Sequence, residues 1–144
     1  MNCLPTKANL LRKGVILNDD LCPLCNDSPE TVSHVFTDCK KAKEVRLVSN
    51  VWWKIFAEDA NNLDSLITGT GANRKVRLIK DAVLQAYFWF IWKGRNEAVF
   101  NDARFNPGVV ANNIQSEVFF WVRNRSNFGN NLNWTDWCCN PETM

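Results

Sequence analysis

The chain has 144 residues, a length that suits one domain or one domain with a small appendage. Hydrophobic residues make up 46% of it, with seven Trp and nine Phe, and this composition excludes wholesale disorder. The formal net charge is only +2, so composition neither requires nor excludes a nucleic-acid partner; clustering of charge would decide it.

The first expected element is a short helix in LPTKANLLRKG, residues 4–14, with Thr6 as its N-cap and Gly14 at its end. Basic residues interrupt the apolar stretches here, so the segment lacks the pattern of a signal peptide. No stretch approaches the roughly 20 apolar residues of a membrane span. We therefore expect an intracellular protein of the nucleus or cytoplasm, with reduced thiols and no membrane partner.

Three of the six cysteines and the single histidine lie close together, with the spacing Cys22-x2-Cys25-x8-His34-x4-Cys39. Two thiolates two residues apart can hold one ion from a tight turn, and the second pair has a separation typical of zinc sites. Three sulfurs and one imidazole complete a tetrahedral shell and leave no place for water or substrate. The spacing therefore predicts one structural zinc ion.

Three other interpretations of this cluster remain open: free buried thiols, a disulfide loop, and a catalytic thiol paired with a histidine. A disulfide is disfavoured in a reducing compartment and would leave a third cysteine unpaired. A catalytic site would use Cys25 or Cys39 with His34, but the sequence has no recognisable oxyanion motif. The full ligand count favours zinc, and we expect no enzymatic activity.

The sequence SPET at residues 28–31 predicts the start of a helix that carries His34. At about 100° per residue, five steps along an α-helix place two side chains roughly 140° apart. His34 and Cys39 would then point apart, so we predict a break near residues 37–38. Asp38 would cap a second helix over residues 39–56, and a thiolate at its start would be favoured by the helix dipole.

The second half of the chain is expected to be helical. A long helix is predicted over residues 73–101, and its middle, AYFWFIW, is apolar all round, so it should be buried on several sides or lie in an interface. Asn106 and Pro107 start another helix, to about residue 126. We predict a mainly α fold in which a small zinc-knuckle arm is joined to a helical bundle. Its parts are a zinc-binding domain at 1–57, a linker at 58–72, a helical region at 73–126 and an irregular tail at 127–144.

Several of these residues also carry a resemblance to a known family. The pattern Leu-Pro-Thr, then Cys-Pro-x-Cys, Glu-Thr, His-x-Phe and Cys resembles the zinc-binding domain that follows the polymerase domain in plant non-LTR retrotransposon reverse transcriptases. Downstream, FWFIWKGRNEAVFN is similar to a W-x-x-W-(K/R)-x-R-N-x-x-x-F segment of the same proteins. The matching residues there are Trp89, Trp92, Lys93, Arg95, Asn96 and Phe100.

The sequence also departs from that family. It contains no Y-x-D-D polymerase motif and no ribonuclease H domain, so we expect a stand-alone fragment that does not polymerise nucleotides. The resemblance implies RNA or DNA, a reverse transcriptase polymerase domain, or another protein as the partner. The alternative is a protein–protein docking module with an exposed aromatic helix face that binds no nucleic acid.

Basic residues follow the last predicted ligand and occur again at residues 74–80. They are candidate phosphate contacts, although a solvated helix face would have the same pattern. Arg95 and Asn96 can be interpreted as a recognition pair or as a structural bridge between helices, and we favour the bridge. Cys3, Cys138 and Cys139 are expected to be free thiols. The predicted nucleic-acid contacts are Lys40, Lys41, Lys43 and Arg46.

Overall fold

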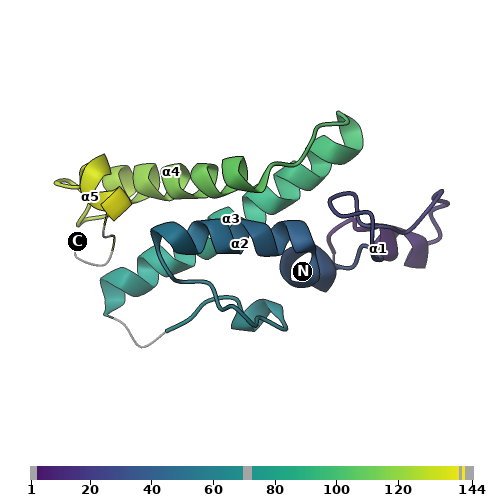
Figure 1. The fold of residues 1–144 in the computed structure, drawn as a ribbon, viewed down its shortest axis with the longest axis horizontal. Coiled ribbons are helices and arrows are strands. Elements are labelled where there is room, and N and C mark those ends of the chain that lie inside the picture. Colours follow the sequence, from purple (N-terminus) through teal and green to yellow (C-terminus); the bar gives the residue numbers. More distant parts are fainter. Residues whose placement is uncertain (1–2, 70–72, 140, 142–144) are drawn as a thin grey trace.

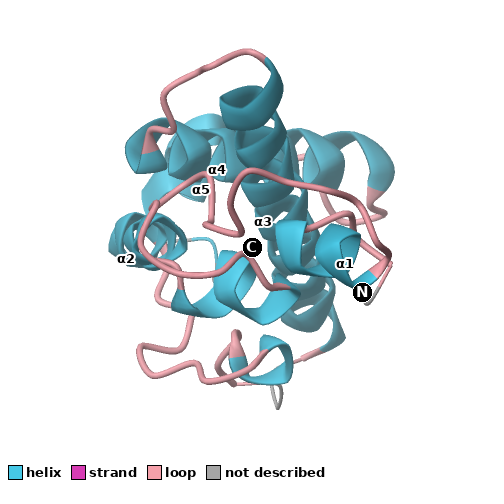
Figure 2. Ribbon diagram, turned by 90° about the vertical axis from the view of Figure 1, so that its right-hand side faces the viewer, coloured by secondary structure: helices cyan, strands magenta, loops and turns pink. Residues whose placement is uncertain are grey.

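The computed structural model describes residues 3–69, 73–139 and 141, and this part of the chain is mainly helical, as predicted. Figure 2 shows helices and loops and no strand in this part of the chain. Two isolated bridges join Leu21 to Pro29 and Phe56 to Ile67. No helix within it is both long and apolar enough to cross a membrane. The elements are α1 (Lys7–Arg12), the π-helix η1 (His34–Asp38), α2 (Lys40–Trp52), the 3-10 helix η2 (Leu63–Ser65), α3 (Arg74–Phe100), α4 (Pro107–Arg125) and α5 (Trp134–Cys139).

The long helix α3 crosses the middle of the molecule (Figure 1) and packs against α4, which also packs against α2. Asn73 caps it by accepting a hydrogen bond from the Val76 amide, which fixes its start within one residue of the prediction. One stripe of its surface is buried, with the 3.6-residue spacing expected of a helix that packs on a core. That stripe contains Val76, Ile79, Val83, Tyr87 and Ile91.

The aromatic middle of α3 is buried on two sides and open on a third. Tyr87 and Ile91 are fully buried, while Phe88 and Trp92 pack partly buried against the core. Trp89, in contrast, is 63% exposed. The all-round apolar pattern therefore reflects contact with η1 and α4 together with an apolar surface that nothing in the described chain covers.

The expected irregular tail instead contains α5, which corrects that part of the prediction. Asn133 caps this helix by accepting a hydrogen bond from the Asp136 amide. The Trp137 ring is fully buried, and its Nε1 donates to the Gln115 carbonyl of α4 at 3.0 Å. Its own carbonyl accepts from Nε1 of Trp52 in α2 at 2.7 Å. Burial of one large ring outweighs the Asn-rich composition, so the tail forms part of the core.

The described part of the expected linker also packs on the helical body. Leu66 is fully buried, and Ala57 donates its amide hydrogen to the Leu66 carbonyl at 2.9 Å. Lys80 of α3 donates to the carbonyls of Thr68 and Gly69, each at 3.0 Å. Lys80 therefore joins α3 to the preceding segment and is buried. Unlike the other basic residues at 74–80, it does not add positive charge to the surface.

Candidate metal centre

The four predicted ligands meet at one place. One donor atom from each of Cys22, Cys25, His34 and Cys39 lies within 4.8 Å of every other. The Sγ atoms of Cys22 and Cys39 are 4.0 Å apart, and Sγ of Cys25 is 3.3 Å from Nε2 of His34. The three cysteines are buried and the histidine is half-buried.

The first two ligands lie on a turn that the chain closes with backbone hydrogen bonds. The Cys22 amide donates to the Ser28 carbonyl, and the Asn26 amide donates to the Cys22 carbonyl, both at 2.8 Å. Asn26 has a φ of 54°, a left-handed conformation that Asn tolerates better than most residues. Pro29 lies in the bridge to Leu21, so the predicted helix start at residues 28–31 is wrong.

The helix that carries His34 starts later, after Thr31, whose Oγ1 accepts a hydrogen bond from the His34 amide at 3.0 Å. It then widens into η1, and the Cys39 amide donates to the His34 carbonyl at 2.7 Å. This i to i+5 pattern brings residues five apart nearer to alignment than an α-helix would. The turn ends at Asp38 and α2 begins at Lys40, so the break between the two helices lies within a residue of the predicted position at residues 37–38.

Cys39 is the N-cap of α2, the position that we predicted for it at a helix start, although Asp38 was expected to be the cap. The hydrogen bond from the Cys22 thiol lowers the pKa of Cys39, and the amides of Ala42 and Lys41 lower it further. The same hydrogen bond, followed by burial, raises the pKa of Cys22. Burial lowers the pKa of His34, which favours the neutral imidazole that a metal requires.

The donor set and its dimensions fit one structural zinc ion. Zinc–sulfur bonds of about 2.3 Å imply sulfur–sulfur edges of about 3.8 Å in a tetrahedron. The 4.0 Å between Cys22 and Cys39 needs only a small contraction. Zinc bound by these four residues would crosslink the turn at residues 22–28, which we call the knuckle turn, to η1 and to the start of α2. All four predicted metal ligands are thus brought together.

The arm is attached to the helical body by a buried ion pair. Glu30 is fully buried and Arg95 of α3 is 4% exposed. Nε of Arg95 lies 2.5 Å from Oε1 of Glu30, and Nη2 lies 2.8 Å from Oε2. The carboxylate also accepts a hydrogen bond from the Lys7 amide at the start of α1, at 2.6 Å. Arg95 is therefore a structural bridge, the interpretation that we favoured.

A second attachment uses the carbonyl groups of η1. Arg46 is 4% exposed, and its guanidinium donates to the carbonyls of Phe36 and Thr37 and to the Tyr87 hydroxyl at 2.8–2.9 Å. Tyr87 donates to the same Phe36 carbonyl at 2.5 Å. The prediction that Arg46 contacts nucleic acid is wrong, because its charge is used inside the protein.

The three lysines of the predicted nucleic-acid cluster lie on the surface of α2. Lys40 pairs with Asp27 of the knuckle turn at 2.7 Å, and Lys41 lies 3.8 Å from Glu44. Lys43 is exposed. Two of these charges are therefore offset by neighbouring carboxylates, and the role of all three in binding stays a prediction.

Sequence reasoning did not identify the partners that hold the metal centre in place. The sequence places Glu30 in a predicted helix start and Tyr87 within the apolar middle, AYFWFIW, of the long helix. The available signal was the pairing of the two segments that carry the family resemblance. Glu30 comes from the first and Arg95 from the second, and Phe36 of the first contacts Phe88 and Trp92 of the second with ring centroids 5.1 and 6.5 Å apart.

Fold and site together define a helical zinc-binding module. The model of one family, described as zinc-binding in reverse transcriptase, matches residues 1–45, which include all four ligands. The match supports a reverse transcriptase zinc-binding domain in this part of the chain. Among curated proteins and solved structures, none matches the chain.

We expect purified protein to contain close to one zinc ion per chain, measured by mass spectrometry of the metal. Apparent binding free energies of about 10–16 kcal/mol in zinc-finger peptides imply nearly full occupancy. Replacement of both Cys22 and Cys25 by Ser removes half of the donors and is expected to abolish binding. The matched control replaces the free thiols Cys138 and Cys139 by Ser and should retain the metal. Zinc retained by the first variant would reject these ligands.

We also expect Glu30→Gln to lower the free energy of unfolding of the zinc-loaded protein by about 3 kcal/mol or more, because it leaves a buried guanidinium without a counter-charge. The measurement is chemical denaturation at constant pH. The control is Glu58→Gln, which removes an exposed pair with Lys54 and should change the value by less than about 0.5 kcal/mol. Equal, small effects would contradict a structural role for the buried pair.

Proposed function

We propose that this chain is a non-catalytic zinc-binding module that positions nucleic acid, either directly or through a reverse transcriptase polymerase partner. The observation that carries the proposal is a complete four-donor shell in an arm that a buried ion pair holds on the helical body. Such a module has a fixed shape on which two partners can be held relative to one another.

A non-catalytic role follows from the donor count. A catalytic zinc ion keeps one position open for water or substrate, whereas three thiolates and one imidazole fill all four positions. The thiolates are also committed to the metal, which removes them as nucleophiles. The reactive pair formed by Cys25 and His34 in a metal-free site would then be absent from the loaded protein.

The partner and the origin of the module are argued from the family. The matched family is described as zinc-binding in reverse transcriptase, and such an enzyme acts on nucleic acid. We extend the proposal to a plant non-LTR retroelement, because the segment around Arg95 is similar to those proteins and its side chains contact the matched region. Reduced cysteine ligands suit the nucleus or cytoplasm.

The zinc-loaded protein is expected to bind single-stranded RNA with an affinity that falls steeply as salt rises. If three or more phosphates are contacted, the logarithm of the association constant should fall with the logarithm of salt concentration with a slope of about −2 or steeper. The slope is measured by fluorescence anisotropy of a labelled RNA of about 12 nucleotides, a length within the range of single-strand binding sites. The titration is repeated at KCl concentrations from about 50 to about 300 mM. Absence of binding at 50 mM, in about micromolar protein, would reject the nucleic-acid role.

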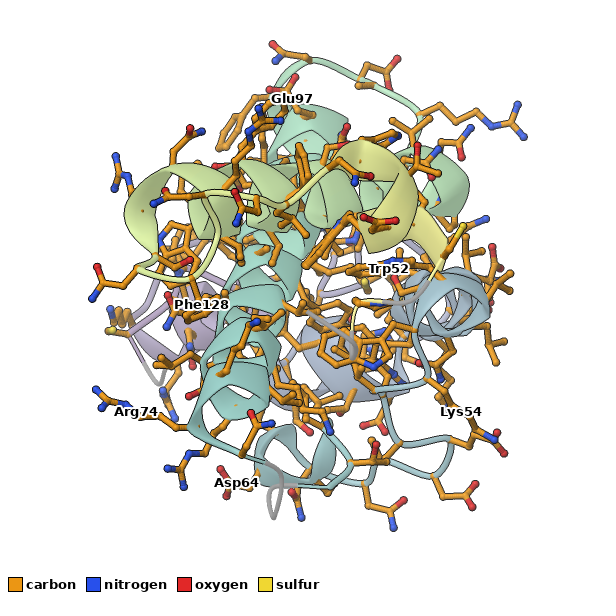
Figure 3. All side chains as sticks on the ribbon, turned by 90° about the vertical axis from the view of Figure 1, so that its left-hand side faces the viewer. Trp52, Lys54, Asp64, Arg74, Glu97 and Phe128 are labelled. Atoms are coloured by element: carbon orange, nitrogen blue, oxygen red, sulfur yellow. The ribbon has the colours of Figure 1, made fainter. Side chains whose placement is uncertain are left out.

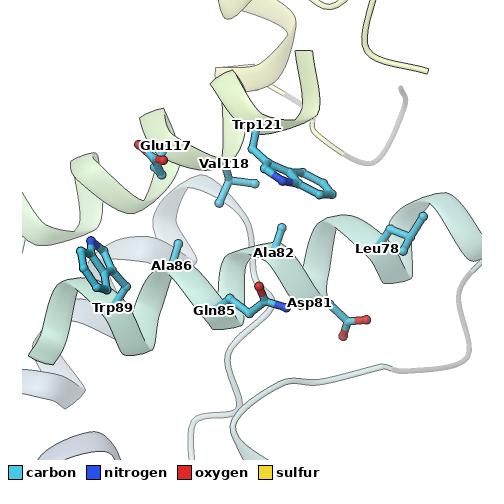
Figure 4. Close-up of a pocket in the computed structure, with 9 residues that line it drawn as sticks. All are labelled: Leu78, Asp81, Ala82, Gln85, Ala86, Trp89, Glu117, Val118 and Trp121. Carbon is cyan, nitrogen blue, oxygen red and sulfur yellow. The ribbon is translucent and has the colours of Figure 1, made fainter. Parts of the chain in front are cut away.

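A second candidate function, protein docking, is favoured by a groove between α3 and α4 (Figure 4). The groove has a volume of about 560 Å³, and Ala82, Ala86 and Val118 lie between Trp89 at one end and Trp121 at the other. Two acidic residues, Asp81 and Glu117, also line it, so an amphipathic helix with basic flanks would complement it. The RNA titration separates the candidates, because docking alone predicts no RNA binding at any salt concentration.

A further inference from the structure

A pocket of about 440 Å³ lies at the end of the molecule away from the zinc arm, where α3 begins and α4 ends. Its volume falls in the range of about 300–1,000 Å³ common for small-ligand sites. We call it the basic–aromatic pocket. Six of the residues that line it are Arg74, Lys75, Leu78, Trp121, Arg125 and Phe128.

We infer that the basic–aromatic pocket binds a nucleotide of a single-stranded nucleic acid, with its phosphate against the three cations and its base stacked on Trp121. The inference rests on the proposed function and gives it a location. Single-strand binding sites combine a positive groove with aromatic rings on which bases stack, and this pocket supplies both.

Charge distinguishes this pocket from the lysines beside the metal centre. It is lined by Arg74, Lys75 and Arg125 and by no acidic residue. Within the described part of the chain, none of these three forms an ion pair, whereas Lys40 and Lys41 each lie beside a carboxylate. Since the whole chain has a net charge of only +2, three unpaired cations around one cavity are a local concentration of positive charge.

The aromatic side of the pocket is already placed for stacking. Trp121 is 37% exposed on α4 and closes the pocket opposite Leu78, which is 39% exposed. Phe128 is half-buried, and Nζ of Lys75 lies 5.0 Å from the centre of its ring. One wall thus carries a ring with a cation beside it, and the other carries the partly exposed indole of Trp121.

The backbone after α4 fixes the position of Phe128. A Cβ atom on Gly129 would overlap the carbonyl oxygen of Val122, so a glycine is required for the chain to turn back against the helix. Figure 3 shows Phe128 and Arg74 on the same flank of α3. The zinc arm lies at the opposite end of the molecule (Figure 1), which leaves that end available for a second partner.

The test compares two triple variants that remove the same charge. Replacement of Arg74, Lys75 and Arg125 by Gln should weaken binding of the labelled RNA on the order of 100-fold at 0.1 M salt and reduce the salt slope by about 2, because each lost contact contributes about 0.7. The second variant replaces Lys40, Lys41 and Lys43 by Gln; because these lysines are the competing location, it should weaken binding less than the pocket variant does. Zinc content and circular dichroism verify that both variants are folded.

Stacking is tested separately at the ring. Trp121→Ala should weaken binding by about tenfold, while Trp121→Phe, which keeps a stacking face, should stay within about threefold of wild type. Photo-crosslinking with RNA that contains 4-thiouridine should label a peptide with Trp121 or Phe128. Poly-glutamate should compete poorly, since it offers charge without bases.

The outcomes separate the location from the function. RNA binding that the pocket variants leave unchanged, or that only the α2 lysine variant loses, would overturn the pocket and keep the proposed function. Crosslinks confined to residues 40–43 would overturn the pocket in the same way. Equal competition by poly-glutamate would assign the pocket to acidic protein segments. Wild-type protein that binds no RNA would overturn the inference and the nucleic-acid function together.

Discussion

The buried carboxylate of Glu30 is the interaction on which the arrangement of this protein depends. A charge removed from water costs several kcal/mol unless its hydrogen bonds are complete, and here they come from separate segments. The guanidinium of Arg95 supplies two, and the Lys7 amide supplies another. The backbone carbonyl of Glu30 also accepts a hydrogen bond from the Ala8 amide at 3.2 Å. One side chain therefore requires α1, the knuckle turn and α3 to lie together in one orientation.

Zinc ligation and the buried ion pair have different structural roles in the arm. The segment between Cys22 and Cys39 buries few large side chains, so zinc ligation would supply the internal order that a hydrophobic core supplies elsewhere. Phe36 is the largest of the buried apolar side chains there, and its edge-to-face contact with Phe88 joins the arm to α3. Glu30 and Phe36 thus orient a unit whose own shape is determined by its ligands.

The parts that could be predicted from the sequence are those with local causes. Ligand spacing identified the four residues of the metal centre, and caps with 3.6-residue periodicity located α3 and α4 within a residue or two. The rest depends on distant partners. Glu30 and Arg95 are 65 positions apart, so no local pattern pairs them. The π-turn after His34 brings His34 and Cys39 to one cluster with Cys22 and Cys25. Trp137 is buried by contacts with Trp52 of α2 and Gln115 of α4, which lie 85 and 22 positions away.

The distance along the chain between these contacts also sets an order in which they can form during synthesis. The outer ligands, Cys22 and Cys39, are 17 positions apart, so the nascent chain can bind its metal soon after Cys39 leaves the ribosome. Arg95 emerges later; at about 5–20 residues per second, the 65 positions after Glu30 take several seconds to translate. For that interval the carboxylate is solvated and the arm is tethered but undocked. Synthesis therefore gives metal binding an interval of several seconds before docking to α3 becomes possible.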